Sequence, residues 1–182
     1  MKRCWISLTG IVIVLFLCPI KMDFADSRGG CPVTPEERTV RGTSLEPLIH
    51  EGQTIRMLQG YYACHPVERG DVVVYRYATG DTTPLIKVVK AVAGDIFSLQ
   101  SNSKGQGWHL LINQEVAQNS QGIPYTIDEH GYQMLMLYVR SYRGQIPARA
   151  CLLLGNQPNG SLDSTHFGLA GQDDLLGKVV LK

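Results

Sequence analysis

The 182-residue sequence has almost no net charge: 17 Lys and Arg residues against 16 Asp and Glu residues leave +1. Proteins that hold nucleic acid by bulk electrostatics carry a basic excess, so we expect no nucleic-acid partner. No unit of about 20–50 residues recurs, which excludes repeat architectures. The sequence also lacks Cys-x-x-Cys, His-Glu-x-x-His and other spacings typical of zinc, so we expect no metal and no cofactor.

Long amphipathic helices are missing as well, and between residues 39 and 182 we predict none beyond one helical turn at 47–51. The chain contains 19 Gly and 9 Pro, and 44% of its residues are apolar, which indicates a turn-rich domain with a core. We predict a mostly β fold. The expected strands lie at residues 39–41, 53–58, 71–77, 85–92, 96–100, 109–112, 133–139, 150–154 and 176–180.

One long apolar run is present, at residues 4–20, with Lys2 and Arg3 before it and Lys21 after it. At about 1.5 Å per residue, a helix of this length covers roughly 25 Å of a hydrocarbon core about 30 Å thick. The flanking lysines can extend to the interface. Because the basic residues come first, we expect a cytoplasmic N-terminus and an extracytoplasmic remainder.

These features predict a membrane anchor at residues 1–22, a polar linker at 23–38 and one domain at 39–182. The alternative is a cleaved signal peptide, with residues 25–27 as a loose small-x-small site. Both readings place the domain outside the cytoplasm.

The cysteines fit an oxidising compartment. Cys31 and Cys64 lie in polar, Pro-flanked segments, and a disulfide between them is a candidate link from the linker to the domain. Cys151 begins an apolar run, where we expect a buried thiol.

Ser44 is a candidate nucleophile, because it lies in a small-residue turn that Pro47 makes rigid. A serine hydroxyl needs a base within hydrogen-bond reach, and no histidine has a context that singles it out. A lysine kept neutral by burial is the other possible base.

The apolar strand expected at 85–92 carries Lys87 and Lys90, which the strand period places on opposite faces. Lys87 has the more apolar neighbours. Lowering a lysine pKa from about 10.4 to about 8 requires roughly 3 kcal/mol, which burial can supply. Taken alone, either residue could also be a strand lysine whose ammonium reaches water.

Four segments, in order along the chain, resemble the sequence boxes of the type I signal peptidases, the Ser/Lys membrane proteases. Residues 42–47 are similar to the nucleophile box Ser-Met-x-Pro, and residues 69–74 to the Gly-Asp strand box. Residues 86–95 are similar to the lysine box, and residues 155–164 to the Gly-Asp-Asn-x-x-x-Ser-x-Asp-Ser box. The resemblance extends over nearly the whole chain.

The resemblance implies a role for each matching residue. Ser44 is the nucleophile, Lys87 is the general base, and Ser161 orients the lysine amine. Asp163 and Ser164 brace this corner of the site. Lys90 is left without a role.

The nucleophile segment departs from the family pattern in two places. The Ser44 backbone N–H is the implied oxyanion donor. The position that adds a serine hydroxyl in part of the family is Gly42, so Thr43 is the candidate for a second donor. Leu45 replaces the usual Met and is expected to line the substrate pocket.

The last box has further departures. Asn156 replaces Asp, Gln157 replaces Asn and Pro158 replaces the common Arg. Thr165 replaces the Arg expected after Asp-Ser, which removes an ion-pair partner of Asp163.

The implied activity is that of a membrane-bound serine endopeptidase that removes signal peptides from exported preproteins through an acyl-enzyme. Its substrates bind in extended conformation, with small residues at the first and third positions before the cut. The implied fold is an antiparallel β-sheet catalytic domain with a smaller inserted β region at about 96–149. Two alternatives stay open: a peptidase dedicated to a conjugative pilin, and an inactive membrane-tethered peptide-binding relative.

Overall fold

The computed structural model describes residues 31–77, 83–102, 105 and 107–181. The anchor expected at 1–22 and the first part of the expected linker, to residue 30, lie outside the described residues. No helix within the described ranges has both the length and the apolar character needed to cross a membrane.

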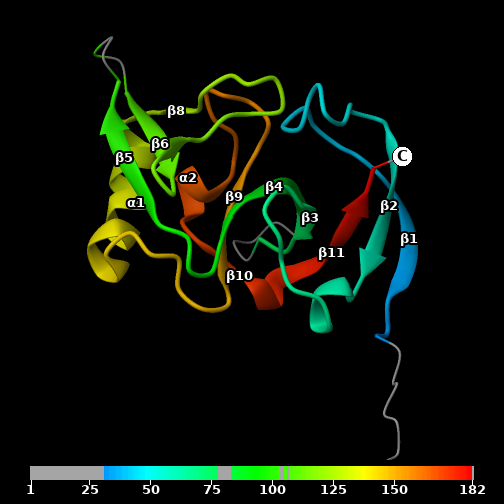
Figure 1. Ribbon diagram of the computed structural model, residues 1–182. Helices are drawn as coiled ribbons and strands as arrows, with labels where there is room; N and C mark the ends of the chain where they lie inside the picture. The colour runs from blue at the N-terminus through cyan, green and yellow to red at the C-terminus, as the bar shows by residue number, and fades with distance from the viewer. Residues whose placement is uncertain (1–30, 78–82, 103–104, 106, 182) are drawn as a thin grey trace, which may run out of the picture. The chain divides into compact units, whose positions relative to one another are not determined.

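A seven-stranded antiparallel sheet forms the larger part of the fold (Figure 1). The strand order is β1-β2-β11-β3-β4-β9-β10, so the C-terminal strand β11 lies between β2 and β3. The strands are β1 (Thr34–Thr39), β2 (Thr54–Gln59), β3 (Val72–Tyr75), β4 (Leu85–Val92), β9 (Ala150–Leu154), β10 (Ala170–Gly171) and β11 (Leu175–Val180). The mostly β prediction is confirmed, and β4 and β9 have the bounds expected from the sequence.

The segment between β4 and β9 forms a second, smaller sheet in which β6 pairs with β5, β7 and β8. These strands are β5 (Phe97–Ser101), β6 (Trp108–Ile112), β7 (Glu115–Val116) and β8 (Thr126–Ile127). The same segment holds the helix α1 (Glu129–Tyr142). Three short helices lie outside this segment: η1 (Tyr61–Ala63), α2 (Ser164–Phe167) and η2 (Gln172–Asp174).

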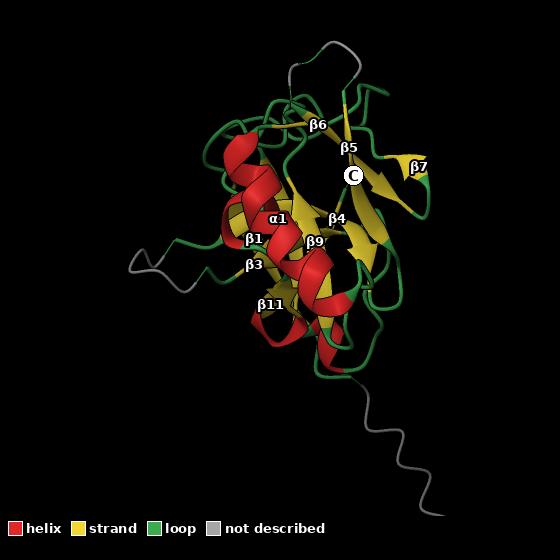
Figure 2. Ribbon diagram, turned by 90° about the vertical axis from the view of Figure 1, so that its left-hand side faces the viewer, coloured by secondary structure: helices red, strands yellow, loops and turns green. Residues whose placement is uncertain are grey.

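Helix α1 contradicts two predictions, the strand at 133–139 and the absence of a long helix. The Asp128 side chain caps the helix by accepting a hydrogen bond from the Gly131 N–H. Leu135 is fully buried, and Tyr132, Tyr138 and Val139 pack against the same core, a three- and four-residue spacing typical of a helix. Residues 134–139 form a continuous apolar run, which a sequence reading can assign to a buried strand or to a helix. The cap and the buried face show that it is a helix. Figure 2 shows α1 on the outside of the sheets.

Strand β1 corrects the predicted extent of the linker. Residues 34–38, expected to be linker, pair with β2 in continuous antiparallel register from Thr34 opposite Gln59 to Thr39 opposite Thr54. β1 is an edge strand, and its side chains are almost all exposed. Its composition is polar because solvent reaches both faces, so the strand has no apolar alternation from which it could be predicted.

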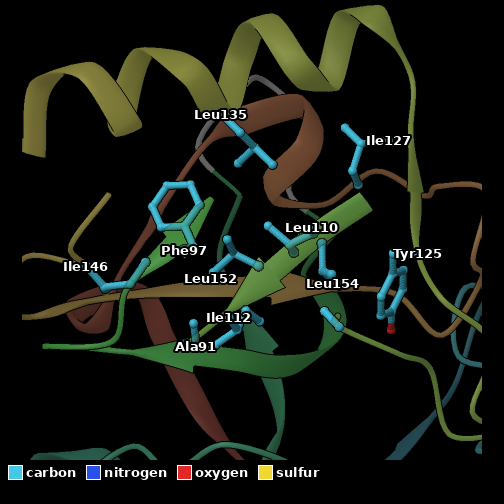
Figure 3. Close-up of a cluster of buried hydrophobic side chains, with 11 residues drawn as sticks. Ala91, Phe97, Leu110, Ile112, Tyr125, Ile127, Leu135, Ile146, Leu152 and Leu154 are labelled. Atoms are coloured by element: carbon cyan, nitrogen blue, oxygen red, sulfur yellow. The ribbon is translucent and has the colours of Figure 1, made fainter. Parts of the chain in front are cut away.

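The main core lies between the smaller sheet, α1 and the strands β4 and β9 (Figure 3). Phe97, Leu110, Leu135 and Leu152 are each at most 1% exposed. Tyr125 belongs to this core, and its hydroxyl donates to the Gly155 carbonyl at 2.7 Å. The inserted region is thus attached to the start of the last sequence box.

An ion pair joins two of the other sequence boxes. The Arg69 guanidinium donates to both carboxylate oxygens of Asp95, from Nε at 2.6 Å and from a terminal nitrogen at 2.5 Å. Val92 N–H donates to the same carboxylate at 2.9 Å. This bidentate contact holds the turn after β4 against the turn before β3.

The structure contains a disulfide between Cys31 and Cys64, with the Cα atoms 5.8 Å apart. It joins the segment before β1 to the residue that follows η1. Cys151 is a buried free thiol.

Replacing both bridged cysteines by serine is expected to lower the free energy of unfolding by about 3 kcal/mol, because the cross-link restricts the unfolded chain over 33 residues. Urea unfolding of the full chain measures the change. Wild-type protein under reductant is the control and should unfold at the midpoint of the double variant. Equal midpoints for the oxidised and reduced protein would show that the bridge adds no stability.

Candidate active site

Ser44 lies in the connection between β1 and β2, in a turn at residues 43–49 that is called the nucleophile turn below. The turn is closed by hydrogen bonds from Glu46 N to Thr43 O at 3.0 Å and from Ile49 N to Leu45 O at 3.1 Å. Ser44 O accepts from Asn156 N at 2.7 Å, whereas the Ser44 N–H donates to no acceptor within the described residues. The backbone of the nucleophile candidate is held through its carbonyl, and its N–H stays available.

Lys87 extends from β4 to the same point. Its side chain is 3% exposed, and its Nζ lies 2.9 Å from Ser44 Oγ and 3.0 Å from the Ile86 carbonyl oxygen. The two residues are 43 positions apart in the sequence, and the sheet brings them together. A hydroxyl and an amine at this separation can exchange a proton.

Burial lowers the pKa of Lys87 to about 8, because the charged ammonium loses most of its hydration. The Asp163 carboxylate opposes this effect and raises the pKa. A substantial part of the lysine is therefore neutral near pH 8.

Lys90 contacts other groups than Lys87, and the register of β4 shifts next to it, between Val89 and Ala91. Its Nζ donates to the Gln118 carbonyl at 2.8 Å and sits 5.3 Å from the centre of the Tyr125 ring. It makes no contact with Ser44 among the described hydrogen bonds.

Asp163 is a buried carboxylate, 1% exposed, whose charge acts on Lys87 of the Ser44–Lys87 pair. One oxygen accepts from Ser161 Oγ at 2.6 Å and from Gly155 N at 3.0 Å. The other accepts from Thr165 N at 3.0 Å and from Thr165 Oγ1 at 2.8 Å. Four donors compensate the buried carboxylate, and Thr165 occupies the position where the family resemblance expects an arginine.

Ser161 was expected to orient the lysine amine directly. Instead its hydroxyl is bonded to Asp163, and no hydrogen bond joins it to Lys87 in the described part of the chain. Ser164 is fully buried, and its hydroxyl accepts from Leu153 N at 2.9 Å, which holds the end of β9.

Gly155 allows Ser161 and the backbone of Ser44 to approach the chain after β9 closely. A Cβ at this position would lie 2.3 Å from Ser161 Oγ and 2.9 Å from Ser44 O, and both distances are too short for any other residue. The chain after β9 thus passes directly between the nucleophile turn and Ser161.

A groove of about 580 Å³ opens at the pair. It is lined by residues at the end of β1 and the start of β4, with Ser44 and Lys87 among them. Leu45 was expected to line a substrate pocket. Instead it is 1% exposed and packs with Val72 and Val88 in the core, where it anchors the turn that carries Ser44.

Two candidates for oxyanion stabilisation lie next to each other. The free Ser44 N–H is one, and the exposed Thr43 is the other. Gly42 has no side chain to contribute, and its N–H donates to the Glu51 carboxylate at 3.0 Å.

Asn156 is a site residue that sequence reasoning missed. It was noted only as a departure from the family pattern, yet its side chain and main chain bond the nucleophile turn. Contacts across 110 positions leave no periodic signal in a single sequence.

Comparison with known proteins identifies the family of the chain. The family model described as signal peptidase, peptidase S26, matches residues 31–182. Signal peptidase IB of Staphylococcus aureus strain COL is 26% identical over 155 residues, covering 81% of this chain and 75% of that protein, and the MRSA252 protein gives the same values. A crystal structure of a signal peptidase I from Enterococcus faecalis V583 is similar, with a TM-score of 0.42 and 18% identity over 64% of this chain and 98% of that one. The chain belongs to the signal peptidase family, peptidase S26.

The low lysine pKa has a consequence for stability. Between its folded pKa of about 8 and its ordinary value of 10.5, the unfolded chain binds more protons, so the folded state gains stability as pH rises. We expect the stability of Lys87→Met relative to wild type to fall by about 2 kcal/mol between pH 7 and 9.5. Urea unfolding at several pH values measures this. Parallel curves for the two proteins would contradict a buried, pKa-shifted lysine.

Proposed function

We propose that this protein is a serine-type endopeptidase that removes signal peptides from exported preproteins, with Ser44 as nucleophile and Lys87 as general base. The observation that carries the proposal is the 2.9 Å contact between Lys87 Nζ and Ser44 Oγ at the end of the groove. Membership of the signal peptidase family supports the reaction class.

The mechanism is acyl transfer. Neutral Lys87 takes the proton of Ser44 as Oγ attacks the scissile carbonyl, and the ammonium then protonates the leaving amine. Water activated by the same amine hydrolyses the ester. The carbonyl of Ile86 holds one N–H of Lys87 at 3.0 Å, which leaves the nitrogen lone pair for the hydroxyl.

The oxyanion that forms on the scissile carbonyl is stabilised by the Ser44 N–H, with the Thr43 hydroxyl as the candidate second donor. Asp163 stabilises the ammonium once it forms, since its carboxylate raises the pKa of Lys87.

The groove suits an extended peptide. β3 pairs with residues 85–87 on one edge of β4, while β9 pairs with β4 only from Val88 onward. In the described structure no strand covers the other edge of residues 85–87, which also line the groove. A substrate segment can add there through main-chain hydrogen bonds. The preference for small side chains next to the cut is what the family resemblance implies.

We further propose that residues 1–22 anchor the protein in the cell membrane, with the domain on the extracytoplasmic side. The apolar run and its flanking basic residues support this orientation. The disulfide supports an oxidising compartment for the domain.

Ser44→Ala and Lys87→Ala are each expected to abolish cleavage of a preprotein by the full chain in detergent, because one lacks the nucleophile and the other the base. The measurement is the amount of mature product on a gel or by mass spectrometry. Lys90→Ala is the matched control, since this strand lysine lies away from the pair, and its effect is expected to be mild. Full cleavage by either of the first two variants would contradict the roles.

The same assay separates lysine from histidine as the base. Activity should rise with pH along a limb near 8, since Lys87 acts in its neutral form. A limb near pH 6 would point to a histidine. Comparing several secreted precursors with a single pilin precursor tests whether the substrate range is broad or dedicated, and absence of turnover on all of them would favour a peptide-binding relative.

A further inference from the structure

Asn156 connects three segments of the chain at 1% exposure. Its Nδ2 donates to Glu46 O at 3.1 Å and to Ser120 Oγ at 2.8 Å, and its Oδ1 accepts from Ser120 N at 2.9 Å. Its backbone N donates to Ser44 O at 2.7 Å, and its backbone O accepts from Asn119 Nδ2 at 3.1 Å. Five hydrogen bonds therefore join the nucleophile turn to the inserted region through one residue.

We propose that Asn156 is a positioning residue for the nucleophile: it fixes the carbonyls of Ser44 and Glu46 so that Ser44 Oγ stays within reach of Lys87 and the Ser44 N–H stays free for the substrate. This inference rests on the proposed peptidase function. It assigns a role to a residue that touches neither the groove nor the lysine amine among the described contacts.

The contacts require an amide. The Ser120 N–H can only donate and the Glu46 carbonyl can only accept, so the side chain between them needs one acceptor and one donor. A carboxylate keeps the shape and the acceptor but turns an oxygen against the Glu46 carbonyl. Asn156 is thus matched to its partners where the family resemblance expects an aspartate.

The loop at residues 118–123, which bonds Asn156, is itself held in place by hydrogen bonds. Asn119 Oδ1 accepts from Gln121 N at 2.9 Å and from Ile123 N at 3.0 Å, which closes the loop on its own side chain. The loop that bonds Asn156 therefore keeps its own shape through the Asn119 side chain.

The decisive variant is Asn156→Asp, with Asn159→Asp as the matched control. Both make the same chemical change in the same box, but Asn159 is exposed and its side chain makes no hydrogen bond in the described part of the chain. A small displacement of a reacting group can cost about 10²-fold in rate, so we expect kcat of Asn156→Asp to fall by up to this factor with KM nearly unchanged. Asn159→Asp should match wild type.

A second readout does not depend on turnover. Amide hydrogen exchange at Glu46, whose N–H closes the nucleophile turn, should become faster in Asn156→Asp and stay unchanged in Asn159→Asp. If wild type cleaves no preprotein but the exchange rates change as expected, the proposed function fails, and only the structural part of the inference, that Asn156 holds the turn, is confirmed. Wild-type kcat or unchanged exchange in Asn156→Asp overturns the inference.

Ser120→Ala keeps the test decisive if Asn156→Asp does not fold. This variant removes one acceptor of the Asn156 amide and leaves its contact with Glu46. A smaller fall in kcat and a smaller rise in Glu46 exchange are expected. Wild-type values for both would contradict the role of Asn156.

Discussion

The site depends on the burial of one amine. Lys87 is 3% exposed, with Nζ within hydrogen-bond distance of one hydroxyl and one carbonyl, and burial lowers its pKa to about 8. An exposed lysine stays charged at neutral pH and cannot accept a proton. The central position of β4, between β3 and β9, therefore determines the chemistry as much as the identity of the side chain.

The hydroxyl partner comes from the turn between β1 and β2, and contacts from other segments hold this turn in place. Asn156 and Gln157 bond the carbonyls of the turn, and Leu45 packs into the core beneath it. The Asp163 carboxylate accepts hydrogen bonds from Gly155, Ser161 and Thr165 and so holds these residues together. These contacts use carbonyls and side chains, and the backbone N–H of Ser44 donates to no acceptor among the residues that the structure describes.

Much of this could be predicted from the sequence, for physical reasons that differ between elements. β4 and β9 are buried apolar runs, and their bounds were predicted as observed. The strand period also separated Lys87 from Lys90. The sequence does not predict β1, because an edge strand exposes polar side chains. It predicts a strand within α1, because residues 134–139 form a continuous apolar run that fits a buried strand as well as a helix.

The contacts that hold the site could not be predicted from the sequence. Ser161 matches a family motif, but whether its hydroxyl meets Lys87 or Asp163 depends on distances set by the fold. Asn156 reaches Glu46 across 110 positions, and Thr165 bonds Asp163 where the family resemblance expects an arginine. Such pairings arise from tertiary packing and have no local pattern.

Lys87 as the general base is tested most directly by an NMR titration of its side chain, selectively labelled at Cε and Nζ, in the folded full-length protein. A buried lysine base should titrate with a midpoint near pH 8, well below the ordinary lysine value. A midpoint above about 10 would show a solvated, charged ammonium and would contradict a lysine base.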